Sequence, residues 1–238
     1  MAPVNVSTKR SSFESLHAEI VACRRCPRLV AWREKVAREK RRAFIREEYW
    51  GRPLPGFGDR RARIILVGLA PAAHGGNRTG RFFTGDRSGD FLFAGLHRLG
   101  LANQPTSMRL DDGLALEDVY IVAPVRCAPP DNRPTPEEFR TCSNFFDREL
   151  SLLSRARVFV ALGAFAWEAI LLHLARRGVA LPRPRAVFAH GAELVTPDAP
   201  ILLGCYHVSQ QNTQTGRLTP AMFDAVIGRA AAIARTGG

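Results

Sequence analysis

The stretch Ile64-Ile65-Leu66-Val67-Gly68 is a continuous run of branched apolar residues that ends in a glycine. Strands that are covered on both faces have this composition, whereas strands with one solvated face alternate apolar and polar residues. The stretch therefore predicts a central strand of a parallel sheet. Three similar runs predict further strands, at residues 119–122, 158–162 and 201–204.

Segments with a helical spacing of apolar residues lie between and after these runs. They cover residues 90–99, 136–153, 164–176 and 220–234. Strands that alternate with helices indicate an α/β fold, with a short central parallel β-sheet flanked by helices on both faces. The chain has 238 residues, of which 46% are hydrophobic, so it is long enough for one core and we expect a single domain.

The N-terminal part predicts two more helices. Residues 11–14 have the S-x-x-E spacing of a capping box, so a helix should begin there and run into Cys23. A second helix with a dense charged face is expected over residues 29–44. Residues 1–11 are expected to form a flexible tail, which leaves residues 12–238 for the domain.

The charge of the chain favours an anionic partner. There are 34 Lys and Arg residues against 22 Asp and Glu, a formal net charge of +12. This excess suits a phosphate-rich molecule, although a generally Arg-rich surface would also produce it. The sequence has no run of about 18 apolar residues and no apolar stretch near Met1. We therefore expect a soluble cytoplasmic protein with no membrane partner.

Five cysteines are present, and disulfides are rare in a reducing compartment. Cys23 and Cys26 have the spacing of a metal clip, while Cys127 and Cys142 lie far downstream. Metal binding or burial is the expectation for these four. Cys205 falls within an apolar strand and should be a buried small side chain.

Two loops follow predicted strands, at the sheet edge where α/β proteins bind ligands. Residues 68–86 are rich in glycine and contain two phenylalanines, which suits close approach of backbone N–H groups and stacking. A plain strand-to-helix connection would also fit. Residues 206–219 contain His207 and a polar stretch with little charge. Such amide and hydroxyl side chains can contact nucleic-acid backbone and base edges.

These two loops, the segment at residues 125–134 and the four cysteines together resemble family 5 (B-type) uracil-DNA glycosylases of bacteria and archaea. The resemblance covers roughly residues 12 to 235, and the loops come in the family's order. It implies a monofunctional glycosylase that flips out uracil and hydrolyses it from damaged single- or double-stranded DNA, starting base-excision repair as a monomer. A lyase step needs an amine nucleophile, and the three motifs hold no lysine.

Two other classes of protein remain open on the sequence. A non-catalytic nucleic-acid-binding protein could keep the fold and the cysteines. Leu69 favours it, because better-known relatives carry a water-orienting polar residue at that place. A metal-dependent nuclease or hydrolase is the other class, but the strand ends lack the clustered carboxylates that bind divalent metals.

The resemblance assigns roles to individual residues. His207 is expected to donate a hydrogen bond to the departing base, and Asp86 to help orient the attacking water. Capping of the helix that begins near Ser88 is an equal alternative for Asp86. Phe83 matches the family's stacking aromatic, with Phe82 beside it as the alternative. The residues expected to contact the base are Gly68, Ala70, Phe83 and Ala123.

The resemblance places DNA contacts on polar and basic residues of the two loops. They are Asn77, Arg81, Ser209, Gln210, Gln211, Asn212 and Arg217. Ala123 stands where many members of the wider superfamily carry an asparagine that reads the pyrimidine edge. Since alanine cannot form those hydrogen bonds, we expect a permissive pocket that also accepts hypoxanthine and ethenocytosine.

The resemblance implies a 4Fe-4S cluster close to the N-terminal helices, bound by Cys23, Cys26, Cys127 and Cys142. Thiolate ligation of such clusters accommodates several spacings. Zinc bound by four thiolates is the alternative, because spacing alone does not separate the two.

Overall fold

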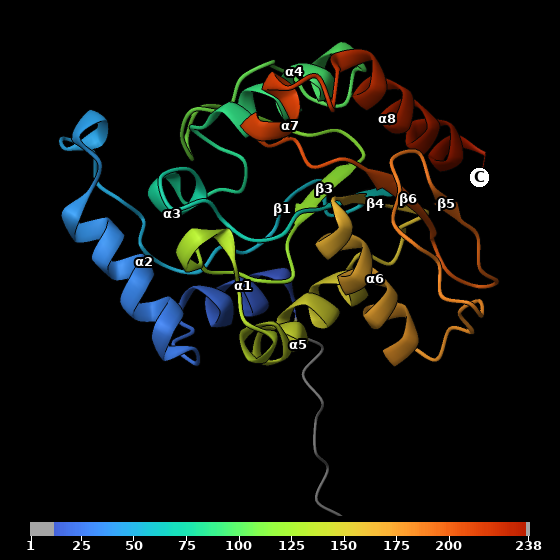
Figure 1. Cartoon of the computed structure of the whole chain (residues 1–238), viewed down its shortest axis with the longest axis horizontal. Helices are drawn as coiled ribbons and strands as arrows, with labels where there is room; N and C mark the ends of the chain where they lie inside the picture. Colours follow the sequence, from blue (N-terminus) through green and yellow to red (C-terminus); the bar gives the residue numbers. More distant parts are fainter. Residues whose placement is uncertain (1–11, 237–238) are drawn as a thin grey trace, which may run out of the picture.

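The computed structural model of the chain describes residues 12–236. The flexible tail expected at residues 1–11 lies outside them. At the centre is a six-stranded sheet with the strand order β1-β3-β2-β4-β6-β5 (Figure 1). Its strands are β1 (Phe57–Gly58), β2 (Ile64–Val67), β3 (Val119–Val122), β4 (Val158–Leu162), β5 (Glu193–Leu194) and β6 (Ile201–Cys205).

The four inner strands are parallel, as the sequence predicts. β2 pairs with β3 on one side and with β4 on the other, and β4 pairs with β6. Every residue of β2, β3 and β4 is buried. The pairing sets Val67, Val122 and Ala161 level with one another. The loops that follow these strands therefore leave the sheet at the same edge.

The two edge strands correct the expectation of a purely parallel sheet. β1 pairs with β3 and β5 pairs with β6, both antiparallel. Each has only two residues, too few for any periodicity of apolar residues to be visible in the sequence. Their residues are also partly or fully exposed, so neither strand forms a buried apolar run.

Helices cover both faces of the sheet, which confirms the predicted layers. α4 and α8 pack on one face through residues such as Phe93 and Phe223. α5 and α6 pack on the other through residues such as Phe146 and Trp167. Figure 1 shows the two pairs on opposite sides of the strands. The helices are α1 (Phe13–Val21), α2 (Pro27–Glu39), α3 (Gly76–Thr79), α4 (Arg87–Arg98), α5 (Pro136–Leu152), α6 (Ala164–Arg176), α7 (Gln210–Gln214) and α8 (Pro220–Arg235), with short 3-10 helices η1 (Arg42–Phe44) and η2 (Pro130–Asn132).

The N-terminal helices differ in detail from the sequence expectation. The side chain that caps α1 is that of Ser12, whose Oγ accepts from the Ser15 N–H at 3.2 Å; Ser11 lies outside the described residues. α2 ends at Glu39, because Lys40 has a φ of +54°. The helix expected to reach residue 44 is therefore too long, and a separate turn follows it.

A fully buried carboxylate connects α5 to four other parts of the fold. Glu149 Oε1 accepts hydrogen bonds from the Tyr120 hydroxyl at 2.8 Å and from the Gly56 N–H at 3.0 Å, and His17 Nε2 lies 3.0 Å away. Arg126 Nη1 stands 2.5 Å from the other oxygen. Burial alone would raise the pKa of Glu149, but Arg126 and the hydrogen bonds from His17 and Tyr120 lower it to about 2. The carboxylate is therefore charged and paired inside the protein.

Candidate active site

Gly68 and Phe83 are in contact at the carboxyl end of β2. The Gly68 N–H donates to the Val122 carbonyl at 2.9 Å, which continues the sheet for one residue. A Cβ atom at position 68 would lie 3.0 Å from Phe83 Cζ. Phe83 has a φ of +52°, and its ring is partly exposed, whereas Phe82 is buried in the core. Of the two phenylalanines, Phe83 is the one that packs against Gly68 and is open to solvent.

His207 lies beside Phe83. The centroids of the two rings are 6.2 Å apart, and the rings are tilted by 40°. The Asn212 amide holds the loop by donating to the His207 carbonyl at 2.8 Å. Burial lowers the pKa of His207 to about 4, so the imidazole is neutral at pH 7. The structure thus brings together Gly68, Phe83 and His207, which are far apart in the chain.

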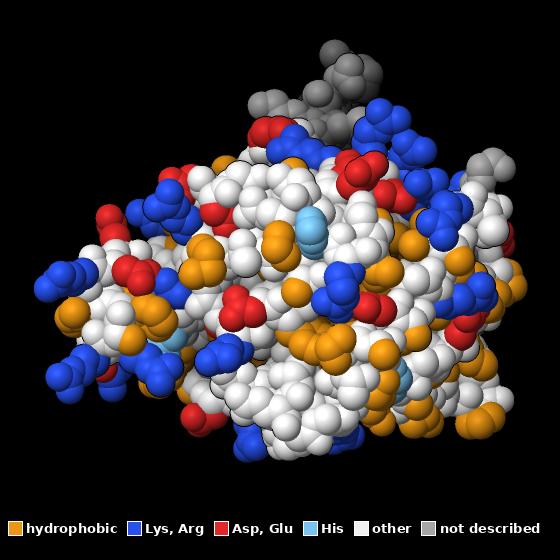
Figure 2. All heavy atoms as spheres, turned by 90° about the horizontal axis from the view of Figure 1, so that it is seen from above, with side chains coloured by type: hydrophobic (Ala, Val, Ile, Leu, Met, Phe, Trp, Pro, Cys, Tyr) orange, Lys and Arg blue, Asp and Glu red, His pale blue; other side chains and the backbone are white. Residues whose placement is uncertain are grey.

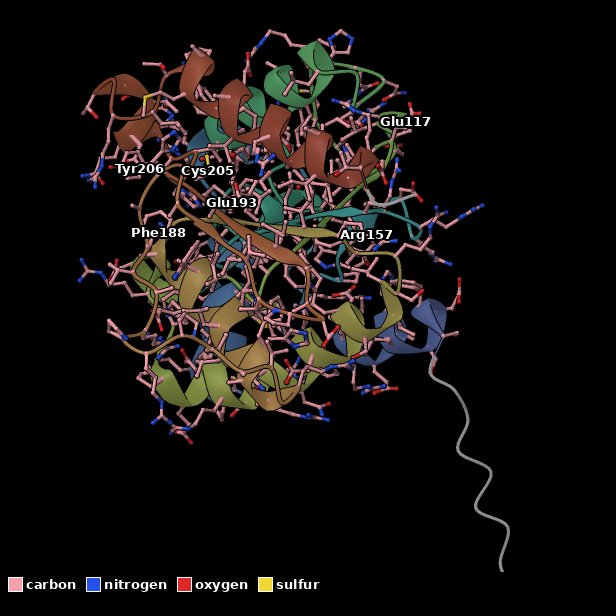
Figure 3. The ribbon with its side chains drawn as sticks, turned by 90° about the vertical axis from the view of Figure 1, so that its right-hand side faces the viewer. Glu117, Arg157, Phe188, Glu193, Cys205 and Tyr206 are labelled. Carbon is pink, nitrogen blue, oxygen red and sulfur yellow. The ribbon has the colours of Figure 1, made fainter. Side chains whose placement is uncertain are left out.

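Tyr206, at the start of the His207 loop, packs against aromatic rings of a neighbouring segment. Its ring stacks on His190 at 4.9 Å and lies 6.2 Å from the ring of Phe188. Figure 3 shows Tyr206 and Cys205 at the end of β6, with Phe188 on the segment alongside. Arg217 places its guanidinium 4.7 Å above the Tyr206 ring and remains exposed. It is therefore positioned at the surface next to the loop.

Asp86 caps α4, as one of its two predicted roles requires. Its Oδ1 accepts from the Gly89 N–H at 2.9 Å. Its Oδ2 faces Gly75, where a Cβ atom would stand only 1.9 Å from that oxygen. Burial raises the pKa of Asp86, against the effect of the backbone hydrogen bonds. One oxygen is thus engaged with the helix, and the other is directed at the glycine-rich loop.

One cleft is lined both by Asp86 with the start of α4 and by the polar part of the His207 loop. The loop contributes Ser209, Gln210 and Gln211. The walls come from distant segments and include Arg41, Phe44, Ala72, His74, Asn132 and Met108. This cleft, which we call the Asp86 cleft, lies at the carboxyl edge of the sheet.

Two residues expected to contact DNA are buried instead. Asn77 is 1% exposed, and its amide donates to the Arg33 carbonyl at 3.2 Å. Arg81 is 5% exposed and donates to both carboxylate oxygens of Asp112, at 2.7 and 2.8 Å. Both side chains hold loops together within the protein. We therefore remove Asn77 and Arg81 from the set of DNA-contacting residues.

Ala70 and Ala123 pack against different hydrophobic clusters. Ala123 is buried in the same core cluster against which Phe83 packs. Ala70 is partly buried and packs toward Leu29 and Cys127. Of these two alanines, only Ala123 belongs to the cluster on which the Phe83 ring packs.

The four cysteines Cys23, Cys26, Cys127 and Cys142 line one cavity. Arg33 is buried and donates to the Cys127 sulfur at 3.0 Å. Burial raises the pKa of Cys127 to about 11 and that of Cys142 to about 12. Across residues 12–236, no group of three or more His, Cys, Asp or Glu side chains is arranged to hold a metal ion. The cysteines therefore surround a common space without converging on one point.

Several residues around these sites give no signal in the sequence. Arg33 and Arg126 reach the cysteine cavity from a charged helix and from the loop after β3. Arg41 and Phe44 fall in a segment that resembles the end of a surface helix. Only the fact that Arg126 directly precedes Cys127 could have suggested a role.

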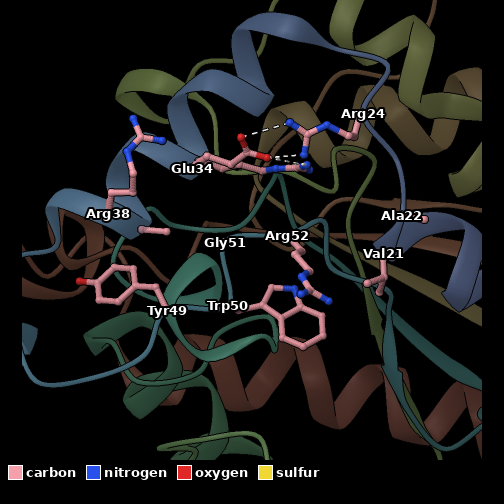
Figure 4. A pocket seen from close by; sticks show the side chains of 11 residues that line it. Val21, Ala22, Arg24, Glu34, Arg38, Tyr49, Trp50, Gly51 and Arg52 are labelled. Atoms are coloured by element: carbon pink, nitrogen blue, oxygen red, sulfur yellow. Dashed lines mark hydrogen bonds and ion pairs between the residues drawn. The ribbon is translucent and has the colours of Figure 1, made fainter.

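A separate pocket lies between α2 and the segment that follows the turn after it (Figure 4). Its wall includes Trp50 and Arg52, and Arg24, in the segment before α2, donates to Glu34 of α2 at 3.1 Å. None of the residues expected at the active site lines it. This pocket is therefore separate from the residues that the structure groups at the carboxyl edge of the sheet.

The chain matches the family model described as the uracil DNA glycosylase superfamily over residues 55–230. The match includes the sheet, the glycine-rich loop and the His207 loop. The chain therefore belongs to the uracil-DNA glycosylase superfamily.

Curated relatives define the group more narrowly. A type-5 uracil-DNA glycosylase of Thermus thermophilus is 57% identical over 210 residues, which are 88% of this chain and 93% of the relative. One from Mycobacterium tuberculosis is 54% identical over 224 residues, 94% of this chain and 82% of the relative. A type-4 uracil-DNA glycosylase of Archaeoglobus fulgidus is 31% identical over 67% of this chain and 63% of its own length. Within the superfamily this chain falls among the type-5 uracil-DNA glycosylases, hydrolases of the N-glycosyl bond that act on uracil in DNA.

Among residues 12–236, no helix has the length and apolar composition needed to cross a membrane.

The two roles of Asp86 can be separated by one substitution. Asn caps a helix about as well as Asp, so Asp86→Asn should leave the melting temperature nearly unchanged. We expect its single-turnover excision rate to fall, because the charge that would orient water is lost. Asp90→Asn, which removes an exposed charge from the same cleft, is the matched control. Full activity of Asp86→Asn would assign the residue to capping alone.

Proposed function

We propose that this enzyme is a monofunctional glycosylase that flips damaged bases, uracil foremost, out of DNA into a pocket between the glycine-rich loop and the His207 loop. The observation that carries the proposal is the contact of Gly68, Phe83 and His207 at the carboxyl edge of the sheet. A base inside a duplex exposes its glycosidic bond to no side chain, so flipping must precede the reaction. The Phe83 ring would form one wall of the pocket.

The residues of the pocket support a division of roles. Breaking the glycosidic bond leaves negative charge on the departing base, and a fixed hydrogen-bond donor lowers the barrier by stabilising that charge. His207 is our choice for this donor. Because its ring is neutral, it donates from one nitrogen only. Asp86 is our choice for orienting the water, since Leu69 has no polar group to do so.

A substitution of His207 tests its role. His207→Ala should slow single-turnover excision of uracil by about 10²-fold or more, the effect of losing one such donor. Binding to uracil-containing duplex should change much less. Because the pKa of His207 is about 4, its ring stays neutral from pH 5.5 to 8, and its titration should add no step near pH 6.5 to the rate. A step near pH 6.5 that His207→Ala removes would contradict the neutral donor.

We propose that the four cysteines hold a 4Fe-4S cluster. Two features support the fit: all four line one cavity, and buried Arg33 and Arg126 provide positive charge beside it. Arg126 pairs with Glu149 through Nη1, while its Nε and Nη2 are buried without a hydrogen-bond acceptor, which suits a second anionic group beside them. When bound, the cluster would supply a covalent link between the N-terminal helices and the loop after β3 rather than a step of the reaction.

The cluster is tested by metal content. Protein purified without oxygen should be brown and contain about four irons per chain. The Cys127→Ala variant should contain less iron and give a lower soluble yield, and its excision rate should be affected less than these two quantities. Cys205→Ala, a buried cysteine outside the cavity, is the matched control and should retain the iron. Stoichiometric zinc without iron would contradict the proposal.

We further propose that the pocket is permissive and that the enzyme acts as a monomer on single- and double-stranded DNA. Ala123 supports the breadth, because its methyl group offers no hydrogen bond to a base edge, and apolar pockets discriminate weakly. Ser209, Gln210, Gln211 and Arg217 remain as the proposed DNA contacts, since these side chains are exposed or line the Asp86 cleft. Asn212 is a weaker candidate, because its amide already binds the His207 carbonyl.

A comparison of lesions tests this breadth. We expect excision of hypoxanthine and ethenocytosine alongside uracil, measured in matched duplexes under single turnover. Uracil in mismatches should be favoured, because opening a weak pair costs less free energy. Ala123→Asn should narrow the range toward uracil. A preference of the wild type for uracil of about a thousandfold or more would contradict a permissive pocket and assign base recognition to Asn132 or to backbone groups.

A further inference from the structure

A basic turn with an exposed apolar tip follows α2. We call residues 41–46, Arg41-Arg42-Ala43-Phe44-Ile45-Arg46, the arginine turn. Its three arginines are exposed, and none of them forms an ion pair with another residue in the part of the chain that the structure describes. Ile45 is 57% exposed between these arginines. Figure 2 shows Lys and Arg side chains gathered at the end of the molecule that α2 and the turn form.

The arginine turn is fixed to the body of the protein. The Arg41 N–H donates to the Tyr49 hydroxyl at 3.4 Å, and that hydroxyl lies 3.0 Å from His74 Nδ1. Figure 4 shows Tyr49 opposite α2, on the segment that returns from the turn. His74 belongs to the glycine-rich loop and lines the Asp86 cleft. The turn is therefore attached to a wall of the cleft.

Arg78 provides a second attachment. Its guanidinium carbon lies 3.9 Å above the Phe44 ring, and it forms an ion pair with Glu47. The same guanidinium donates to the Gly85 carbonyl at 2.6 Å, one residue before Asp86. Arg78 thus joins the arginine turn to the segment that carries Asp86.

The turn lies at the rim of the Asp86 cleft, because Arg41 and Phe44 line it together with Asp86. Across the cleft, the polar segment at residues 209–217 has no apolar side chain, and Val208 before it is fully buried. A nucleotide that leaves a duplex opens a gap in the base stack, and apolar side chains fill such gaps in many DNA-binding proteins. An apolar side chain that fills the gap would therefore come from another part of the rim.

Exposed apolar side chains occur in two segments of the rim, at Ile45, which directly follows the cleft residue Phe44, and at Met108 and Leu110. Met108 is 58% exposed and also lines the cleft. It is followed by Arg109, which pairs with Asp111 at 3.0 Å, and by a second acidic residue, Asp112. Asp112 pairs with Arg81 in turn, so the two arginines near Met108 are each bound to a carboxylate and are not free to bind phosphates. Ile45 is flanked by three arginines, whose charge suits phosphates on either side of a base step.

We propose that the arginine turn binds the DNA duplex at the lesion, with Ile45 inserted into the base stack and Arg41, Arg42 and Arg46 on the neighbouring phosphates. Ile45 is then a positioning residue, because it holds the duplex open and does not touch the reacting atoms. This inference rests on the proposed excision from duplex DNA. It adds a contact on the opposite side of the cleft from the His207 loop.

The test compares substrates that differ only in the duplex to be opened. Ile45→Ala should slow single-turnover excision of uracil paired with adenine by about tenfold or more, since the inserted side chain is lost. Excision from a mismatch with guanine should fall less. Excision from a single strand should stay within about twofold of the wild type, because no stack must be opened. Ile45→Leu, which keeps an apolar side chain of the same size, should restore most of the rate on duplex.

Two matched variants serve as controls. Val195→Ala removes an exposed apolar side chain beside the amino end of β6 and should stay near the wild-type rate on every substrate. Met108→Ala removes the exposed apolar side chain of the cleft wall and should show no loss confined to duplex DNA. Unchanged excision from duplex by Ile45→Ala, an equal loss on single strands, or a loss confined to duplex in Met108→Ala would each overturn the proposal. A wild type that excises uracil from single strands and not from duplex would instead contradict the proposed function.

The arginines have an independent readout in binding. The affinity for a uracil-containing duplex should depend less on salt in Arg42→Gln and Arg46→Gln, with a slope lower by about one for each phosphate contact removed. The affinity of these two variants for single-stranded DNA should fall less than their affinity for duplex. An unchanged salt dependence would overturn the phosphate contacts of the arginine turn.

Discussion

The buried carboxylate of Glu149 is the interaction on which the arrangement of the chain depends. An unpaired charge in the interior is strongly destabilising, so the folded state requires its partners. They come from α1, from the segment before β1, from β3 and from the loop after β3. The last of these partners, Arg126, also lines the cysteine cavity. One carboxylate thus fixes both the N-terminal helix and a wall of the proposed cluster site.

The proposed base pocket depends on a second constraint, the absence of a side chain at Gly68. The Phe83 ring occupies the space that a side chain would need, and this places Phe83 within reach of His207. The loop that carries Phe83 is held in turn by Arg81 and Arg78, which bond to Asp112 and Gly85. Arginines in a DNA-binding protein would be expected at the surface. Here several of them serve to hold loops in place.

The inner strands could be predicted from the sequence because each is a continuous apolar run buried on both faces. The grouping of Gly68, Phe83 and His207 follows from the parallel order of β2 and β6. The burial of Asn77 and Arg81 could not be predicted, because their partners lie 44 and 31 residues away along the chain. The arginine turn could not be predicted from the sequence for a related reason. It continues the charge pattern of α2, and only the φ of Lys40 ends the helix before it.

The strand order has a consequence for the space between the two loops. The chain passes from β2 to β3 on one side and then returns to β4 on the other, so a topological switch point lies between β2 and β4. Crevices form at such points in α/β sheets. β4 is followed directly by Gly163, which has a φ of +102°, and a Cβ atom there would lie 3.4 Å from that of His207. At Gly163 the chain therefore contributes backbone and no side chain to the crevice. The side chains that follow the neighbouring strands set the width of the crevice.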